Sequence, residues 1–257
     1  MITLAVFDMA GTTVNDGGGV YQALKQSVEE TGVTVSEADL QTWMGTEKRA
    51  AITALISLGG GDPEHPADKV DATFDRFRAI LSELYAATPP TPIAGAPEAI
   101  AALRADGIKV ALTTGFSRDV ATGVLDALGW GVETEKLDPA AVSAGSGSAT
   151  SDAVTVDALV CGDEVAMGRP APYMIHRAME LTGTLSIEEV LVAGDTLVDV
   201  TAGSNAGAKI TLGVLSGKLV REDFAGQPHA DLLESVAQVP DYLRNRADLH
   251  LQNTSPS

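Results

Sequence analysis

The sequence predicts an α/β fold: a doubly wound parallel sheet with a helical domain inserted after its first strand. Five short apolar runs are continuous rather than alternating in polarity, which is typical of strands buried on both faces of a parallel sheet. Helical segments lie between the later runs, as in strand–helix–strand units with right-handed crossovers. Residues 8–107, between the first two runs, contain no convincing strand. The chain of 257 residues is long enough for one large domain that carries a smaller one.

The core is predicted from the apolar runs and from the helices between them. The expected strands are Ile2–Phe7, Ile108–Leu112, Ala158–Cys161, Val190–Ala193 and Lys209–Leu215. The expected core helices are Glu98–Asp106, Val120–Leu128, Tyr173–Leu181 and Asp199–Ala206. Gly129–Thr155 is predicted to be a surface loop around a small polar stretch, and Gln252–Ser257 a frayed tail.

The inserted segment is predicted to be helical throughout. Its expected helices are Val20–Thr31, Ser36–Met44, Glu47–Leu58 and Ala67–Ala87. The prolines of Thr88–Pro92 predict a stiff linker at its exit, and Gly17–Gly19 a flexible hinge at its entry. We therefore assign residues 1–15 and 92–257 to the α/β core, and residues 16–91 to a helical domain, which we call the cap.

Charge and composition exclude several classes of function. The chain has 17 Lys and Arg against 35 Asp and Glu, a net charge of −18, which disfavours binding to nucleic acid or to anionic membranes. Cys161 is the one cysteine, so neither an intrachain disulfide nor a cysteine-based zinc site is expected. No apolar run is long enough to cross a membrane, and the N-terminus does not resemble a signal peptide. These features predict a cytoplasmic protein.

Polar residues follow four of the predicted strands. Asp8 follows the first strand, Thr114 and Gly115 the second, Arg169 the third, and Asp195 with Asp199 the fourth. Parallel strands present their carboxyl ends at one edge of the sheet, where ligands bind in such folds. Carboxylates hold a hard cation such as Mg²⁺, a hydroxyl and a guanidinium bind phosphate oxygens, and one aspartate is left as a nucleophile. Each residue alone is weak evidence, because a single aspartate after a strand is more often a helix N-cap than a nucleophile and Thr113–Gly115 is more often a turn. Their convergence at one edge of the sheet favours a phosphoryl-transfer site.

The order of these motifs resembles the haloacid dehalogenase superfamily, over nearly the whole chain. The inserted helices stand at that family's cap position. The resemblance implies that Asp8 attacks phosphorus and that Thr114 and Arg169 hold the phosphoryl oxygens. It implies a Mg²⁺ cofactor held by Asp8, the main-chain carbonyl of Ala10 and Asp195, with Asp199 in support.

Two departures resemble the phosphonatase branch of this superfamily. Most family phosphatases carry a second aspartate where this chain has Ala10, and a lysine where it has Arg169. Asp8–Val14 is similar to the phosphonatase signature DxAGTTVD, apart from Asn15 at its last position. Gly168–Met174 is similar to its GRPxPWM stretch, and Met44–Lys48 to its MGxxK sequence. The resemblance extends substrate contacts to Thr12, Met44, Gly45 and Gly115.

The resemblance gives Lys48 the role of replacing the second carboxylate; the alternative is a solvated lysine on a helix surface, beside Glu47. Cleavage of a carbon–phosphorus bond expels a carbanion, which an imine between a lysine and the substrate aldehyde can accept as an enamine. Lys48 would form this imine, and its pKa should be lowered because the amine must be neutral. Phosphonatase also has a histidine where this chain has Ala51 and a cysteine near the place of Gly18.

The sequence is compatible with three functions. The first is hydrolysis of phosphonoacetaldehyde or a related phosphonate, and the second is hydrolysis of small phosphate monoesters. The third is a non-catalytic binding module, which the complete set of site residues disfavours. The expected partner is a small-molecule substrate, and the resemblance implies a homodimer.

Overall fold

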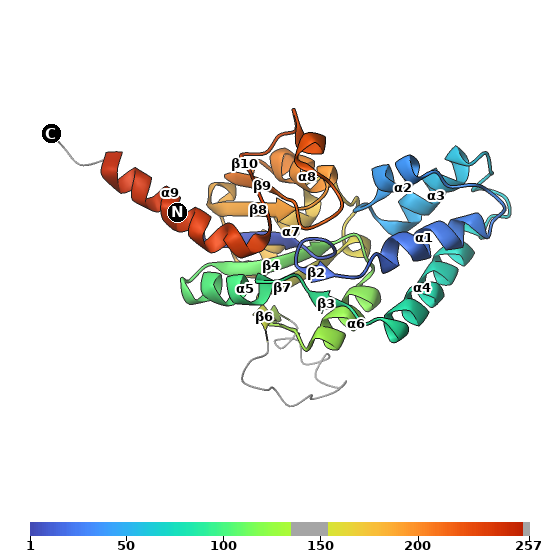
Figure 1. The fold of residues 1–257 in the computed structure, drawn as a ribbon, viewed down its shortest axis with the longest axis horizontal. Helices are drawn as coiled ribbons and strands as arrows, with labels where there is room; N and C mark the ends of the chain where they lie inside the picture. The colour runs from blue at the N-terminus through green and yellow to red at the C-terminus, as the bar shows by residue number, and fades with distance from the viewer. Residues whose placement is uncertain (135–153, 254–257) are drawn as a thin grey trace.

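A computed structural model describes residues 1–134 and 154–253, with side chains to residue 246 (Figure 1). Most of the predicted surface loop, residues 135–153, and the end of the predicted tail, residues 254–257, lie outside the described residues. Within the described ranges no helix combines the length and the apolar character that crossing a membrane requires.

The core is a six-stranded sheet in which all neighbouring strands are parallel, in the order β10-β9-β8-β1-β4-β7. The strands are β1 (Leu4–Asp8), β4 (Lys109–Thr114), β7 (Ala158–Cys161), β8 (Val190–Gly194), β9 (Ile210–Val214) and β10 (Asp231–Leu233). All five predicted strands are present. The sixth strand, β10, was not predicted, because this short edge strand is half-exposed and has no continuous apolar run.

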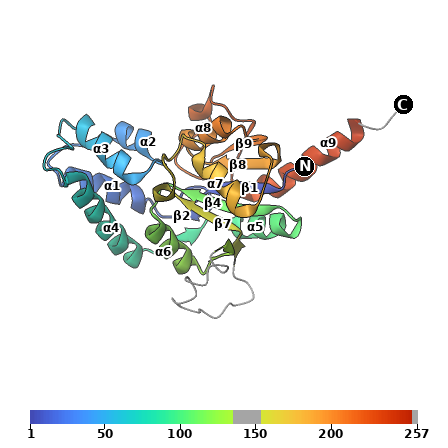
Figure 2. The ribbon, with the colours of Figure 1, turned by 180° about the vertical axis from the view of Figure 1, so that it is seen from behind.

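Helices cover both faces of the sheet, which confirms the doubly wound α/β class (Figures 1 and 2). They are α5 (Ala96–Ala105), α6 (Arg118–Leu128), α7 (Tyr173–Thr182), α8 (Leu197–Ala206) and α9 (Val239–Asn253). Alternate residues of β1 point to opposite faces: Leu4 and Val6 belong to the cluster under α7 and α8, whereas Ala5 and Phe7 belong to the other cluster. Every residue of β1 is buried, so this strand holds Asp8 at a fixed position.

Four helices fill the interval between residues 15 and 91: α1 (Gly19–Glu29), α2 (Glu37–Trp43), α3 (Lys48–Leu58) and α4 (Lys69–Ala87). They lie together at one end of the sheet, opposite the projecting α9 (Figure 1). Their apolar faces form a common core with Leu24, Ile52 and Phe77. The Glu47 side chain accepts hydrogen bonds from the backbone amides of Arg49 and Ala50, both at 2.9 Å, and so fixes where α3 begins.

Two short antiparallel strands, β2 (Val14–Asn15) and β3 (Thr91–Pro92), join the connections that enter and leave these helices. The predicted domain boundaries, at residues 15–16 and 91–92, run through this ladder. The division into two domains stays a prediction. A second pair, β5 (Gly131–Val132) and β6 (Thr155–Val156), flanks the residues outside the description.

Candidate active site

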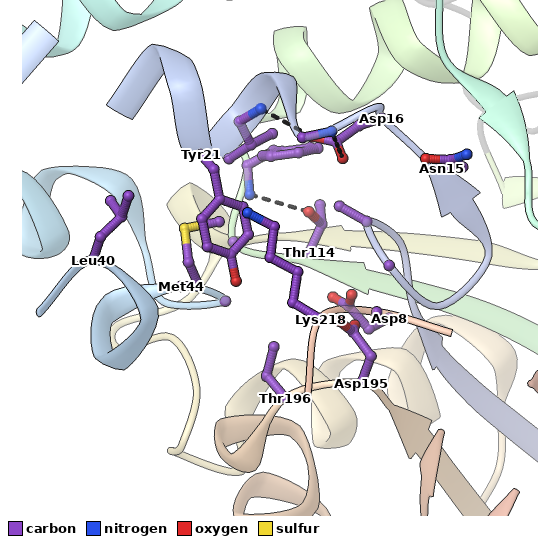
Figure 3. Close-up of a pocket in the computed structure, with 18 of the residues that line it drawn as sticks. Asp8, Asn15, Asp16, Tyr21, Leu40, Met44, Thr114, Asp195, Thr196 and Lys218 are labelled. Carbon is purple, nitrogen blue, oxygen red and sulfur yellow. Dashed lines mark hydrogen bonds between the residues drawn. The ribbon is translucent and has the colours of Figure 1, made fainter. Parts of the chain in front are cut away.

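The predicted catalytic side chains meet at the carboxyl edge of the sheet (Figure 3). Asp8 ends β1 and Thr114 ends β4, while Asp195 follows β8. The pairing of β1 with β4 places Asp8 opposite Thr113 and therefore next to Thr114. Arg169 comes from the loop after β7, and all four side chains are buried. The topology of the sheet thus brings together residues that are up to 187 positions apart, from Asp8 to Asp195 (195 − 8).

Three buried carboxylates form the centre of the site. Asp8, Asp195 and Asp199 each offer an oxygen, and these oxygens lie within 4.8 Å of one another. Arg169 forms ion pairs with both Asp8 and Asp199 through one terminal nitrogen. The Arg169 Nε is also buried but has no hydrogen-bond partner, so one donor of the guanidinium is left for a ligand.

Glycines hold the carboxylate of Asp195 against the main chain. A Cβ atom on Gly11 would lie 2.3 Å from Asp195 Oδ2, and one on Gly217 only 1.9 Å from the same atom. Gly11 also has a φ of +92°, which favours glycine. The Thr12 hydroxyl donates a hydrogen bond of 2.9 Å to Asp195 Oδ1. Asp195 is therefore oriented before any ligand binds.

The donor set fits a hard divalent cation. Burial raises the pKa of Asp8 to about 7, although Arg169 opposes this shift. Burial, followed by the charges of Asp8 and Asp199, raises the pKa of Asp195 well above its usual value. Both shifts mean that the charged carboxylates are disfavoured, first because they are buried and then because they repel one another, and that Arg169 does not compensate for this fully. Oxygen ligands around uncompensated charge are what Mg²⁺ requires, and Ala10 lies on the wall of the same cavity.

Lys48 is the second buried cation of the site. It is the first residue of α3, its side chain is 2 % exposed, and its ammonium donates a hydrogen bond of 3.0 Å to the Thr46 carbonyl. Burial, and then the charge of Arg169, lower the pKa of Lys48 to about 8 against the opposing charges of Glu47 and Asp8. The amine can therefore lose its proton near neutral pH, as an imine-forming lysine must.

The loop of residues 44–48 lies directly on the core. A Cβ atom on Gly115 would be 2.4 Å from the Thr46 carbonyl oxygen. A Cβ atom on Gly45, whose φ is +79°, would be 3.0 Å from Thr196 Oγ1 and 2.9 Å from a methyl of Val198. Only glycine fits both positions, so the close approach of the two backbones brings Lys48 over the sheet edge.

One cavity of about 600 Å³ contains most of the predicted residues. Those on its wall are Asp8, Ala10, Met44, Gly45, Lys48, Thr114, Gly115, Arg169 and Asp195. Thr12 and Asp199 are not on the wall: Thr12 is wholly buried against Asp195, and Asp199 lies behind Arg169. The contact of Thr12 with Asp195 assigns it to orienting that carboxylate.

The cavity also contains residues that the sequence analysis missed. Asp16 and Tyr21 come from the entry to α1, Thr196 follows Asp195, and Ser216 with Lys218 follows β9. The rule that ligands bind after strands would have found the last two, because they come directly after the fifth apolar run. Asp16 and Tyr21 have no such local signal, since their place depends on how the inserted helices fold back.

Comparison with known proteins places the chain among hydrolases. A family model described as haloacid dehalogenase-like hydrolase matches residues 2–207. A phosphonoacetaldehyde hydrolase of Parabacteroides distasonis is 30% identical over 241 residues, which cover 88% of this chain and 83% of that protein.

Solved structures share the fold. A hydrolase from Pseudomonas syringae has a TM-score of 0.75 at 19% identity, covering 95% of this chain and 98% of that one. A protein from Oleispira antarctica, described as phosphonoacetaldehyde hydrolase-like, has a TM-score of 0.72 at 21% identity, covering 100% and 96%. At these identities the structures establish the architecture alone.

Proposed function

The chain belongs to the haloacid dehalogenase-like hydrolases, and we propose that it hydrolyses the carbon–phosphorus bond of phosphonoacetaldehyde or a closely related phosphonate. The observation that carries this proposal is the buried amine of Lys48 in the same cavity as Asp8. Position 10 is an alanine, whereas most phosphatases of this superfamily carry an aspartate there. A relative at 30% identity is named phosphonoacetaldehyde hydrolase.

Mg²⁺ is the cofactor that the carboxylates fit. Asp8, Asp195 and the main-chain carbonyl of Ala10 would hold the ion, with Asp199 in support. When bound, it neutralises charge on the phosphoryl oxygens and on the attacking carboxylate. Thr12 and the glycines that touch Asp195 keep that ligand in place.

Lys48 acts first in the proposed reaction. Its neutral amine adds to the substrate aldehyde and water leaves, so that an imine joins the substrate to Lys48. The Thr46 carbonyl, 3.0 Å from the amine, holds the lysine in position before this step. Protonation of the imine nitrogen prepares it to accept the electron pair of the carbon–phosphorus bond.

Asp8 then attacks phosphorus in line with the bond that breaks. One carboxylate oxygen forms the aspartyl-phosphate, and the bonding pair of the carbon–phosphorus bond moves into the imine to give an enamine. Arg169 and Thr114 hold the phosphoryl oxygens, where their contribution is positioning and charge neutralisation. The enamine takes a proton at carbon, water releases acetaldehyde and Lys48, and a second water releases phosphate from Asp8.

Turnover with two products tests this proposal. The protein with Mg²⁺ and phosphonoacetaldehyde should release acetaldehyde and inorganic phosphate in equal amounts. Lys48→Arg keeps the charge but cannot form the imine, and Asp8→Asn removes the nucleophile, so both should reduce turnover to background. Lys209→Arg, an exposed lysine paired with Glu188, is the matched control and should keep full activity.

A phosphatase of small phosphate monoesters is the second candidate. Ala51, on the turn of α3 after Lys48, is wholly buried and offers no side chain for proton transfer. The nucleophile, the proposed cation ligands and the phosphoryl-binding residues do not include Lys48. Without a carboxylate at position 10, they could still hydrolyse an ester with a good leaving group. Release of phosphate from such an ester, with no turnover of phosphonoacetaldehyde and no effect of Lys48→Arg, would favour this reading over the first.

A further inference from the structure

Lys218 is a cation of the cavity that the proposed reaction does not use. It follows β9 and its side chain runs from beside Asp195 to the ring of Tyr21 (Figure 3). The ammonium lies 3.4 Å from the centroid of that ring. A ring face attracts the charge but accepts no conventional hydrogen bond, so the ammonium protons of Lys218 stay available to a ligand.

The backbone that carries Lys218 is fixed. Gly217 packs directly on the carboxylate of Asp195, and the Ser216 hydroxyl donates a hydrogen bond of 2.7 Å to the Gly11 carbonyl. The Tyr21 ring is fixed in turn, since its hydroxyl donates a 2.7 Å hydrogen bond to Gln41 Oε1. Lys218 is thus anchored beside the reacting carboxylates at one end and on a helix of the insert at the other.

The carboxylates near this end of the cavity are already engaged. Glu37 forms an ion pair with Lys25. Asp16 accepts hydrogen bonds from the backbone amides of Gly18 and Val20, at 3.1 and 2.9 Å. Lys218 is close enough to Glu37 for the two charges to interact. Within the part of the chain that the structure describes, however, no carboxylate forms an ion pair with Lys218, so its ammonium can still form one with a ligand.

The cavity is also larger than phosphonoacetaldehyde needs. That molecule has seven non-hydrogen atoms, and at about the volume of one water each it would fill roughly 200 Å³. The cavity measures about 600 Å³. The remaining space includes the end at which Lys218 lies.

We infer that Lys218 is a specificity-determining residue, which binds a second anionic group at the end of the substrate remote from phosphorus. The inference rests on the proposed function for the position of the phosphorus at Asp8. It extends the substrate class from phosphonoacetaldehyde to related phosphonates that keep the carbonyl group and carry a carboxylate or a second phosphate at the other end. For the phosphatase alternative it points to phosphate esters that carry such a group. An ammonium with free donors beside a ring is suited to such a group, because charge-assisted hydrogen bonds are the stronger ones.

Binding of non-reactive ligands tests this without relying on turnover. Calorimetric titration in Mg²⁺ compares phosphonoacetate, phosphonopropionate and phosphonobutyrate with alkylphosphonates of the same lengths. At the length that reaches Lys218, the carboxylated ligand should bind at least about tenfold more tightly than its uncharged counterpart. Lys218→Met should abolish this ratio, Lys218→Arg should keep most of it, and the distant control Lys209→Met should leave it unchanged.

Two results would overturn the inference. One is equal affinity of the unmodified protein for the carboxylated phosphonate and the alkylphosphonate at every chain length. The other is Lys218→Met weakening both ligand series equally, as it would if Lys218 only held the inserted helices against the core. Failure to turn over phosphonoacetaldehyde while the ratio persists would reject the proposed substrate and keep the second anion site, so the two failures are distinguishable.

Discussion

Lys48 and Arg169 are buried cations with opposite responses to their surroundings. Burial dominates at Lys48 and lowers its pKa to about 8. At Arg169 burial acts in the same direction, but Asp199 and Asp8 outweigh it and raise the pKa above its usual value. Arg169 therefore stays charged to bind phosphoryl oxygens, whereas Lys48 can become a nucleophile.

The pH dependence of turnover should report the state of Lys48. Because the reaction needs the neutral amine, kcat/KM for phosphonoacetaldehyde should rise about tenfold per pH unit between about pH 7 and pH 8 and level off above it. Below pH 7 the dependence should be steeper, because Asp8 also takes up a proton. Hydrolysis of an activated phosphate ester, which needs Asp8 but no imine, should lack the inflection near pH 8. A shared profile for the two substrates would contradict this role of Lys48.

Thr12 should act on metal affinity rather than on substrate. Thr12→Val keeps the shape of the side chain but removes the 2.9 Å hydrogen bond to Asp195. Loss of such an orienting contact should weaken Mg²⁺ binding about tenfold or more, measured as the Mg²⁺ concentration for half-maximal activity. Thr12→Ser retains the hydroxyl and should restore most of the affinity. Equal affinity in the valine variant would show that Asp195 needs no orientation from Thr12.

At the scale of elements, backbone contact between the inserted helices and the core sets the position of Lys48. The loop before α3 touches the loop after β4 at Gly45 and Gly115. The ladder of β2 and β3 ties the two connections together on the other side. The insert is therefore held against the sheet edge by local contacts, and Lys48 reaches the site only while they are made.

Gly115→Ala should separate these elements. The new Cβ would lie 2.4 Å from a main-chain oxygen, so the loop carrying Lys48 must move. We expect a loss of about 1–3 kcal/mol in the free energy of unfolding, as in other overpacked sites, and a large fall in kcat. Gly123→Ala is the matched control, because its Cβ would meet no atom within 4 Å inside α6 and should stabilise the protein slightly. Chemical denaturation measures the stability of the two variants, and a turnover assay measures their activity. A stable and active Gly115→Ala variant would show that this backbone contact does not position Lys48.

The elements show what a sequence can reveal of this fold. Continuous apolar runs located five strands, and the residues after four of them form the part of the cavity wall that carries Asp8, Thr114, Arg169 and Asp195. Tyr21 could not be found in this way, because its place depends on the tertiary packing of α1 against the core. Thr12 was predicted to touch substrate, yet the structure turns it towards Asp195; the sequence carries no information on which way a loop side chain points.

For the whole molecule, the site is a source of instability that a cation can relieve. The raised pKa values of Asp8 and Asp195 mean that these groups bind protons more readily in the folded than in the unfolded chain. Their favourable contribution is therefore complete below about pH 4, the range of an ordinary aspartate, and is lost as the pH rises through about 7. Mg²⁺ binds only the folded arrangement, and it should bind best when the carboxylates are charged.

Thermal unfolding should show this linkage. Excess Mg²⁺ should raise Tm by several degrees at pH 8 and by much less at pH 5, relative to the same protein with a chelator. Asp195→Asn removes one charge, so it should reduce the effect of Mg²⁺ at pH 8 and raise the Tm of the metal-free protein. Scanning calorimetry measures these changes. If Mg²⁺ raised Tm equally at pH 5 and pH 8, the ion would not bind at these carboxylates.

Borohydride trapping tests most directly whether Lys48 forms an imine with the substrate. The protein is mixed with phosphonoacetaldehyde and Mg²⁺, reduced with borohydride, digested, and analysed by mass spectrometry. In the unmodified protein we expect an ethyl group on Lys48, because reduction then follows cleavage of the carbon–phosphorus bond. In Asp8→Asn, where this bond stays intact, we expect a phosphonoethyl group on Lys48. No other lysine should be modified in either protein. Absence of any adduct under conditions of full turnover, or an adduct on Lys218 instead, would contradict the account.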